Sequence, residues 1–296
     1  FYFAENEEQL DKILEVRDEC PSLKKIIVYD MEGLNDFKDD QVLSYEEFIQ
    51  FGKKLDADQP DLWLQSINSV EADDIAILVY TSGTTGPSKG AMINHKNLLY
   101  SVNTGVEIFE AREHEEQLSF LPLCHILERS VSVMFPLKTG AVVNFAESID
   151  TVPENIREVS PTVFVAVPRI WEKFYSSITI LMKDATFIGR YFYNLSINTG
   201  AKYKEYFIEG KEPPLKLKLM FWICNQLVLK NIKKLLGLNN CRYALSGAAP
   251  ISPELINWYL SLGIDMREGW GMTETAGVGT AFYSREIKLG HVGRAV

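Results

Sequence analysis

One segment of glycines, hydroxyl residues and a single lysine, placed directly after an apolar run, constrains the fold of this chain most. Residues 75–80 read Ile-Ala-Ile-Leu-Val-Tyr, and residues 81–90 read Thr-Ser-Gly-Thr-Thr-Gly-Pro-Ser-Lys-Gly. The apolar run is typical of a buried strand, and Asn94 with the residues after it is typical of a capped helix start. Glycines let the backbone approach an anion, while hydroxyl groups and Lys89 can donate hydrogen bonds to phosphate. The pattern therefore predicts a strand, a phosphate-binding loop and a helix.

Apolar runs of strand type alternate with helical patterns along most of the chain. The expected strands lie at 25–29, 75–80, 118–121, 141–145, 162–167 and 242–245. The expected helices include 98–108, 127–137 and 253–262, the last with Ser252 as its N-cap, Pro253 in its first turn and Gly263 as its terminator. Such alternation predicts an α/β fold of mostly parallel sheets flanked by helices.

Residues 168–236 interrupt this alternation, because they hold helical patterns and few strand signals. We expect them to form a helical insert that decorates the α/β core. Within it, residues 215–224 read Leu-Lys-Leu-Lys-Leu-Met-Phe-Trp-Ile-Cys. This mixture fits a helix packed on its own domain with snorkelling lysines, and it also fits a helix lying on a membrane surface. No apolar run reaches the length of about 20 residues that a membrane-spanning helix needs.

Charge and cysteine content exclude several classes of protein. The formal net charge of the 296 residues is −10, which argues against a general nucleic-acid binder, since such binding needs a basic surface. The four cysteines are far apart, so neither a disulfide framework nor a zinc site is indicated, and a reducing cytoplasm is the expected location. Acidic residues follow Phe1 within a few positions, so no secretory signal is expected at this end.

Three further segments place polar or aromatic side chains after strand-like runs. Residues 121–129 read Leu-Pro-Leu-Cys-His-Ile-Leu-Glu-Arg, residues 246–250 read Ser-Gly-Ala-Ala-Pro, and residues 267–275 read Arg-Glu-Gly-Trp-Gly-Met-Thr-Glu-Thr. In α/β proteins, ligands bind where the carboxyl ends of the strands meet. The small residues of the second segment allow a flat ring to lie against the backbone. Taken singly, each segment also fits a structural role such as a tight turn or a helix cap.

The side chains of the last segment suit a nucleotide. Trp270 can stack on a purine, Thr273 can donate a hydrogen bond to a phosphate, and Glu274 can bind magnesium, which prefers oxygen ligands. The order Ser-Lys-Gly at 88–90 excludes the ordinary P-loop, in which Gly-Lys is followed by Ser or Thr.

Together the four segments resemble the motifs of the adenylate-forming superfamily, which includes acyl-CoA synthetases, firefly-type luciferases and the adenylation domains of peptide synthetases. The sequence Pro-Leu-Cys-His-Ile-Leu-Glu-Arg at 122–129 is similar to the form found in long-chain fatty acyl-CoA synthetases of the bubblegum-like branch. The resemblance implies that residues 1–296 form part of the large AMP-binding domain, with the small C-terminal domain and its lysine expected to be absent. It also implies two reactions: a fatty acid and ATP give an acyl-adenylate and pyrophosphate, and coenzyme A then displaces AMP.

The resemblance assigns roles to individual residues. Those implied to act in catalysis are Lys89, Thr273, Glu274 and His125. Those implied to hold the β- and γ-phosphates are Thr81, Ser82, Gly83, Thr84, Thr85, Gly86 and Lys89. Those implied to frame the adenine and the α-phosphate are Gly247, Ala248, Ala249, Glu268, Gly269, Trp270, Gly271, Met272 and Thr273. Magnesium would be held by Thr81 and Glu274, and the acyl chain would enter an apolar tunnel between the sheet and the helical insert.

Two alternatives stay open at this stage. One is an adenylating enzyme for another carboxylic acid, although no aspartate for an amino group lies within 124–129. The other is a non-catalytic module that binds a nucleotide or a lipid. The expected partners are the small molecules ATP, a fatty acid and coenzyme A, and peripheral contact with a membrane surface stays open. The sequence indicates no oligomeric state.

Overall fold

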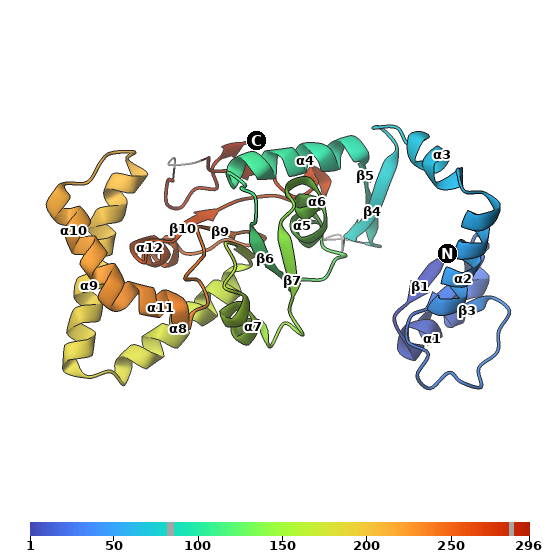
Figure 1. Ribbon diagram of the computed structural model, residues 1–296, viewed down its shortest axis with the longest axis horizontal. Coiled ribbons are helices and arrows are strands. Elements are labelled where there is room, and N and C mark those ends of the chain that lie inside the picture. The colour runs from blue at the N-terminus through green and yellow to red at the C-terminus, as the bar shows by residue number, and fades with distance from the viewer. Residues whose placement is uncertain (82–85, 284–286) are drawn as a thin grey trace. The chain divides into compact units, whose positions relative to one another are not determined.

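The structure of the protein is a computed structural model, and it describes residues 1–81, 86–283 and 287–296 (Figure 1). The chain forms two compact units, residues 1–71 and residues 72–296. All four segments discussed above lie in the second unit.

The first unit is a small parallel sheet with helices packed against it. Its strands β1 (Tyr2–Ala4), β2 (Ile26–Val28) and β3 (Val42–Ser44) lie in that order in the sheet. Its helices are α1 (Glu7–Val16), the 3₁₀ turn η1 (Arg17–Glu19), α2 (Tyr45–Asp58) and α3 (Leu62–Asn68). Ser44 and Glu47 form a capping box that starts α2. Ala4, Leu10 and Ile26 are among the residues buried between sheet and helices.

The second unit is built on parallel strands, as the sequence predicts. Strands β8 (Val163–Ala166), β9 (Tyr243–Ser246) and β10 (Asp265–Glu268) form one sheet in the order β10-β9-β8. Strands β6 (Glu116–Ser119) and β7 (Val142–Phe145) form a second parallel pair. Helix α7 (Val152–Val159) connects β7 to β8, and helix α12 (Pro253–Ser261) connects β9 to β10. Helix α12 begins as predicted, because the Ser252 side chain accepts a hydrogen bond from the amide of Leu255.

The predicted strand, loop and helix around residues 80–95 needs a correction. Strand β4 (Ile75–Thr81) pairs antiparallel with β5 (Lys89–Asn94), and Thr81 lies opposite Lys89. The prediction of a buried strand is wrong, because every residue of β4 is at least partly exposed in this two-stranded sheet. A second strand therefore separates the loop from helix α4 (His95–Ile108), which Asn94 caps as expected. Strand β5 was not predicted from the sequence, since it begins with Lys89 and Gly90 and both residue types are uncommon in strands. A second antiparallel pair joins β11 (Thr280–Ala281) to β12 (Arg294–Ala295).

A helical stretch predicted at 127–137 is interrupted by a π-turn. It consists of α5 (Ile126–Arg129), the π-turn η2 (Ser130–Met134) and α6 (Phe135–Thr139). Within the π-turn, the carbonyl of Val131 accepts a hydrogen bond of 2.7 Å from the side-chain amide of Gln117.

Residues 168–236 hold helical elements and no strand. These elements are α8 (Pro168–Lys183), α9 (Phe187–Ile208), α10 (Leu215–Cys224), the π-turn η3 (Asn225–Leu229) and α11 (Lys230–Leu235). They lie together at one end of the second unit, as Figure 1 shows. Trp171 of α8 is fully buried, and its carbonyl accepts a hydrogen bond of 2.7 Å from the hydroxyl of Tyr259 on α12. Among the described helices, none is both long and apolar enough to cross a membrane.

Candidate active site

A cavity of about 550 Å³ brings together residues from all four segments. The predicted site residues that line it are Thr81, Lys89, His125, Gly247, Ala248, Gly269, Trp270, Gly271, Met272, Thr273 and Glu274. Three predicted residues, Gly86, Ala249 and Glu268, are described but are not among the lining residues. The predicted residues Ser82, Gly83, Thr84 and Thr85 lie outside the described part of the chain.

The parallel sheet explains why two of the segments meet. Strands β9 and β10 are neighbours, and Ser246 lies opposite Glu268 at their carboxyl ends. The segments that follow them therefore leave the same edge of the sheet. Glu268 is buried below this edge, and its carboxylate accepts a hydrogen bond of 3.4 Å from the amide of Ile251. Its position supports the backbone after β9 instead of facing the cavity.

The backbone around Trp270 is held by its pairing with Thr280. The amide of Trp270 donates to the carbonyl of Thr280 at 3.0 Å, and the amide of Thr280 donates back at 2.9 Å. Gly271 allows the next turn to close, because a Cβ atom there would lie only 1.6 Å from the carbonyl oxygen of Gly277. The indole of Trp270 stays about half exposed, which leaves it able to contact a ligand.

A short turn presents Thr273 and Glu274 to the cavity. It is the 3₁₀ turn η4 (Thr273–Thr275), followed by Ala276 in the left-handed conformation with φ of 54°. From α4, the hydroxyl of Ser101 donates a buried hydrogen bond of 2.8 Å to the carbonyl of Ala276. Ser101, which sequence reasoning missed, therefore anchors the turn that carries both predicted polar groups.

His125 lies at the start of α5 with one ring nitrogen already used. Its Nδ1 accepts a hydrogen bond of 3.2 Å from the amide of Leu127, so in the neutral ring the proton is on Nε2. Nε2 is thus the donor available to a ligand. The buried carboxylate of Glu128 accepts hydrogen bonds from Ser119 at 2.6 Å and Ser132 at 2.7 Å, which fixes the same helix to β6 and the π-turn.

The apolar lining of the cavity was not predicted. Its remaining lining residues are Gly105, Ile108, Phe109, Ile126, Leu127, Leu245, Gly277, Val278 and Ala281. The helical period of α4 indicates a buried face, yet only the tertiary structure shows that this face ends at a cavity. The family resemblance predicts an apolar tunnel between the sheet and the helical insert. None of the described lining residues belongs to 168–236, so this cavity does not contain that tunnel.

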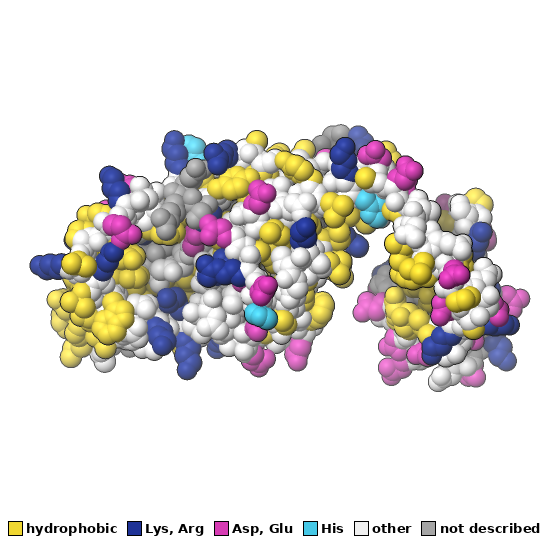
Figure 2. Space-filling model, turned by 45° about the horizontal axis from the view of Figure 1, so that its top comes forward, with side chains coloured by type: hydrophobic (Ala, Val, Ile, Leu, Met, Phe, Trp, Pro, Cys, Tyr) yellow, Lys and Arg dark blue, Asp and Glu magenta, His cyan; other side chains and the backbone are white. Residues whose placement is uncertain are grey.

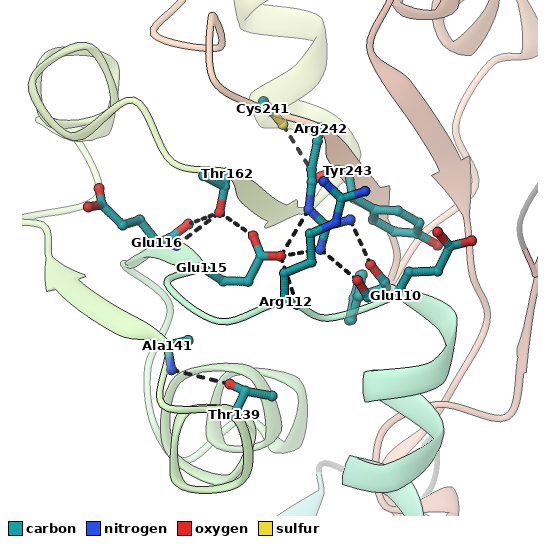
Figure 3. A network of polar contacts seen from close by, with 11 residues as sticks. Glu110, Arg112, Glu115, Glu116, Thr139, Ala141, Thr162, Cys241, Arg242 and Tyr243 are labelled. Atoms are coloured by element: carbon teal, nitrogen blue, oxygen red, sulfur yellow. Dashed lines mark hydrogen bonds and ion pairs between the residues drawn. The ribbon is translucent and has the colours of Figure 1, made fainter.

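A polar network around Glu115 and Arg242, drawn in Figure 3, lies near the end of α4, whose last residue, Ile108, lines the cavity. Arg242 donates hydrogen bonds to the carbonyl groups of Phe109 at 2.9 Å and Glu110 at 3.1 Å. The same guanidinium forms an ion pair with Glu115, in which Nε lies 2.9 Å from the carboxylate. Thr162 donates a further bond of 2.5 Å to Glu115. The network therefore positions Phe109, whose ring packs edge-on against Tyr243 with centroids 4.7 Å apart.

The network also determines the charge state of Glu115. Burial alone would raise the pKa of this carboxyl group, but hydrogen bonds from Arg242 and Thr162 outweigh burial and lower the pKa. Glu115 is therefore ionised in the folded protein over the neutral pH range.

The donor set of the cavity suits a magnesium ion that shares its ligands with a nucleotide. Thr81 and Glu274 supply one hydroxyl group and one carboxylate. Among the described residues, no three His, Cys, Asp or Glu side chains gather as they would in a protein-only metal site. Magnesium usually keeps several waters and binds one or two carboxylates together with substrate phosphates. The residues present are therefore compatible with magnesium bound as a nucleotide complex.

Comparison with known sequences gives matches along the whole chain. A model of the AMP-binding enzyme family matches residues 1–296. The chain is 33% identical over 301 residues to the long-chain-fatty-acid–CoA ligase ACSBG2 of Xenopus laevis, covering 99% of this chain and 40% of that protein. It is 32% identical over 292 residues to human ACSBG2, covering 97% of this chain and 42% of that protein. The chain thus spans about 40% of the length of these curated relatives.

Solved structures confirm the predicted fold class. The anthranilate CoA ligase AuaEII in complex with anthranoyl-AMP superposes with a TM-score of 0.61 at 20% identity, covering 98% of this chain and 44% of that one. The o-succinylbenzoate CoA synthetase of Bacillus subtilis superposes with a TM-score of 0.55 at 17% identity, covering 97% of this chain and 46% of that one.

Proposed function

Because the chain belongs to the AMP-binding enzyme family, we propose that its protein activates a long-chain fatty acid with ATP and transfers the acyl group to coenzyme A. In the first step a carboxylate oxygen attacks the α-phosphorus of ATP, which forms an acyl-adenylate and releases pyrophosphate. In the second step the sulfur of coenzyme A attacks the acyl carbon, which forms the thioester and releases AMP. The identity to long-chain-fatty-acid–CoA ligases supports this choice of substrate.

The observation that carries the proposal is the convergence of four distant segments on one cavity. Thr81 and Lys89, His125 with the two residues after it, residues 245, 247 and 248, and residues of the stretch 269–281 contribute to its lining. Catalysis of phosphoryl transfer depends mainly on positioning and on charge stabilisation, so the cavity must hold groups of both kinds. Its polar groups suit the nucleotide, while its apolar side suits a purine ring or the first carbons of an acyl chain.

We assign roles to the polar side chains according to their chemistry. Lys89 would neutralise negative charge on the β- and γ-phosphates, and the hydroxyl of Thr273 would donate to the α-phosphate. Thr81 and Glu274 would hold magnesium, which supplies further positive charge to the phosphates when bound. His125 would donate from Nε2 to the carboxylate of the fatty acid.

The adenine would lie between Trp270 and the backbone at Gly247 and Ala248. Trp270 offers an exposed aromatic face, and Ala248 holds its backbone in the left-handed conformation with φ of 67°. A large side chain at 248 would be strained in this conformation. The small residues therefore suit close contact between backbone and ring.

The reaction would take place in the cytoplasm. All four cysteines are free, and Cys124 is exposed, which suits a reducing compartment. ATP, the fatty acid and coenzyme A are the partners that this function requires.

A binding experiment tests the site and the substrate class together. Non-hydrolysable acyl-adenylate mimics carrying acetyl, octanoyl, palmitoyl or aminoacyl groups would be titrated into the protein by calorimetry. We expect the palmitoyl mimic to bind most tightly, since each buried CH₂ group contributes about 0.8 kcal/mol. Tightest binding of the aminoacyl mimic would instead identify an enzyme for another carboxylic acid. Equal binding of all four would contradict the proposed acyl site.

Two substitutions test the nucleotide site. Lys89→Ala removes a phosphate-binding charge and Glu274→Ala removes a magnesium ligand, so each should weaken Mg-ATP about 10-fold or more, given about 1.5–3 kcal/mol for a charged hydrogen bond. The matched controls are Lys138→Ala and Glu158→Ala, which change exposed residues away from the cavity. Unchanged ATP affinity in both site variants would overturn the assignment.

A further inference from the structure

The helical insert differs in charge from the rest of the protein. Residues 168–236 contain twelve lysines and arginines against five aspartates and glutamates, a net charge of +7, whereas the whole chain has a net charge of −10. A positive region on an acidic protein attracts anionic partners and orients the protein so that this region faces them. The insert also exposes several large apolar side chains, and Figure 2 shows apolar groups on the end of the second unit that carries it.

An apolar groove lies within the insert, apart from the candidate active site. Its volume is about 450 Å³, and it opens between α8, α9, η3 and α11. The exposed large apolar side chains among its lining residues are Leu181, Phe192, Leu227 and Leu235, each between 45% and 64% exposed. The polar side chain of Asn231 at its edge is already engaged, since its amide donates to the carbonyl of Leu227 at 3.1 Å. The groove therefore offers contact to apolar groups and few polar ones.

On α8, α9 and α11, basic residues stand next to groove-lining residues in the sequence. Lys183 follows the lining residue Met182, and Arg190 follows the lining residue Gly189. On α11, Lys230 and Lys234 stand next to lining residues and are exposed. An apolar groove with basic neighbours is complementary to a surface that has an apolar interior and negative head groups.

Helix α10 extends the same pattern. Its inner face holds Phe221, whose ring stacks on Tyr203 with centroids 4.2 Å apart, and the buried Cys224. Its outer face holds Leu215, Leu219 and Trp222, all more than half exposed.

Two lysines flank the outer stripe of α10. Helical spacing places Lys216 on one side of it and Lys218, which forms an ion pair with Glu212, on the other. A helix that is apolar on both faces is normally buried on both. The outer face of α10 therefore requires a partner that the described residues do not supply.

We propose that these residues form one docking surface for an anionic lipid membrane. The insert surface comprises the groove residues Leu181, Phe192, Leu227 and Leu235, and the α10 residues Leu215, Leu219 and Trp222. Tryptophan favours the boundary between lipid head groups and acyl chains, and lysine can place its stem on apolar groups while its ammonium group contacts head groups. Since none of the described helices can span a bilayer, the insert would lie on the membrane.

Charge favours a membrane over a second copy of this chain. Two copies meeting through their inserts would bring two regions of net charge +7 together, and like charges facing one another oppose association. An anionic bilayer meets the basic residues with opposite charge and covers the apolar ones at the same time. The proposal does not depend on the proposed reaction, because the insert surface and the candidate active site share no residue.

Vesicle sedimentation tests the proposal. The protein would be mixed with vesicles of phosphatidylcholine, with or without about a third of phosphatidylserine, at low and at high salt. We expect binding to the vesicles that contain phosphatidylserine and at least a 10-fold weaker partition at high salt, because exposed charges are screened. Equal binding to neutral vesicles, or no binding to either, would overturn the proposal.

Matched variants locate the contact. Trp222→Ser, and separately the pair Lys230→Glu with Lys234→Glu, should each lower the partition at least 5-fold. Trp63→Ser is the control, because Trp63 is similarly exposed but belongs to the first unit. Binding of the palmitoyl-adenylate mimic should be unchanged in all three, which separates loss of the docking surface from loss of the active site. An equal effect of Trp63→Ser, or self-association abolished by Trp222→Ser without any effect on vesicles, would refute membrane docking.

Discussion

The buried pair of Arg242 and Glu115 gives a prediction whose size follows from its surroundings. Arg242→Met keeps most of the apolar stem of the side chain but removes the guanidinium group. The carboxylate of Glu115 is only 3% exposed, and it would keep hydrogen bonds from Thr162 and from the amide of Arg112. Removing one partner of a buried pair costs about 3–5 kcal/mol. Because two donors remain, we expect destabilisation near the lower value, about 3 kcal/mol.

Urea unfolding followed by tryptophan fluorescence would measure this loss. The fully buried Trp171 reports on the second unit, where the pair lies. With a dependence on urea of about 3 kcal/mol/M, the midpoint should fall by about 1 M. Glu115→Gln is the matched variant, since it removes the charge without leaving an unpaired carboxylate, and it should cost less than Arg242→Met. In the double variant, the loss should be smaller than the sum of the two single losses.

The pH dependence of this difference provides a second check. In the unmodified protein the folded pKa of Glu115 is lowered, so its stabilising contribution is present above the unfolded pKa and is lost as pH falls toward the folded value. Without Arg242, burial should raise the folded pKa, so acidification should stabilise the variant at this residue. The difference in unfolding free energy should therefore shrink between about pH 7 and about pH 4. A difference below about 1 kcal/mol at neutral pH, or one independent of pH, would refute the reasoning.

Two further predictions concern the turn that carries Thr273 and Glu274. Gly271→Ala should weaken ATP binding at least about 10-fold in calorimetry, because the new Cβ atom would overlap the carbonyl oxygen of Gly277 and displace the turn. The control Gly52→Ala places its Cβ in open space and should leave ATP affinity unchanged. Ser101→Ala removes the bond to the turn and should cost about 1–2 kcal/mol of stability and several-fold in ATP affinity. The control Ser261→Ala, which removes a hydrogen bond within α12, should lower stability alone; an equal loss of ATP affinity in this control would contradict the anchoring role of Ser101.

Local signals in the sequence predicted much of the fold. The starts of α4 and α12 were predicted correctly, because capping depends on a side chain and an amide three residues apart. Strand β5 was missed, since its pairing with β4 depends on residues across a loop. The family prediction is confirmed by the match across residues 1–296, because the four motifs keep their order and their chemistry.

The candidate site was predicted in its polar part and missed in its apolar part. Motif residues such as Trp270 and Lys89 carry recognisable chemistry, and both line the cavity. Ile108 and Phe109 look like ordinary core residues in the sequence, and only the network around Arg242 places them at the cavity. Ser101 gave no signal either, because its partner, Ala276, lies 175 positions away.

The π-turn between α5 and α6 has a consequence for how this region can change. Each residue of an α-helix advances the chain by about 100° around the helix axis. A π-turn holds one residue more per turn than an α-helix, so deleting one residue from 130–134 would let the segment become a regular α-helix while His125 kept its direction relative to α6. The π-turn thus accommodates an extra residue without changing the rotation of the imidazole relative to the rest of the domain. A deletion in the α-helical part, where no π-turn compensates for it, would instead rotate the imidazole by about 100° relative to α6.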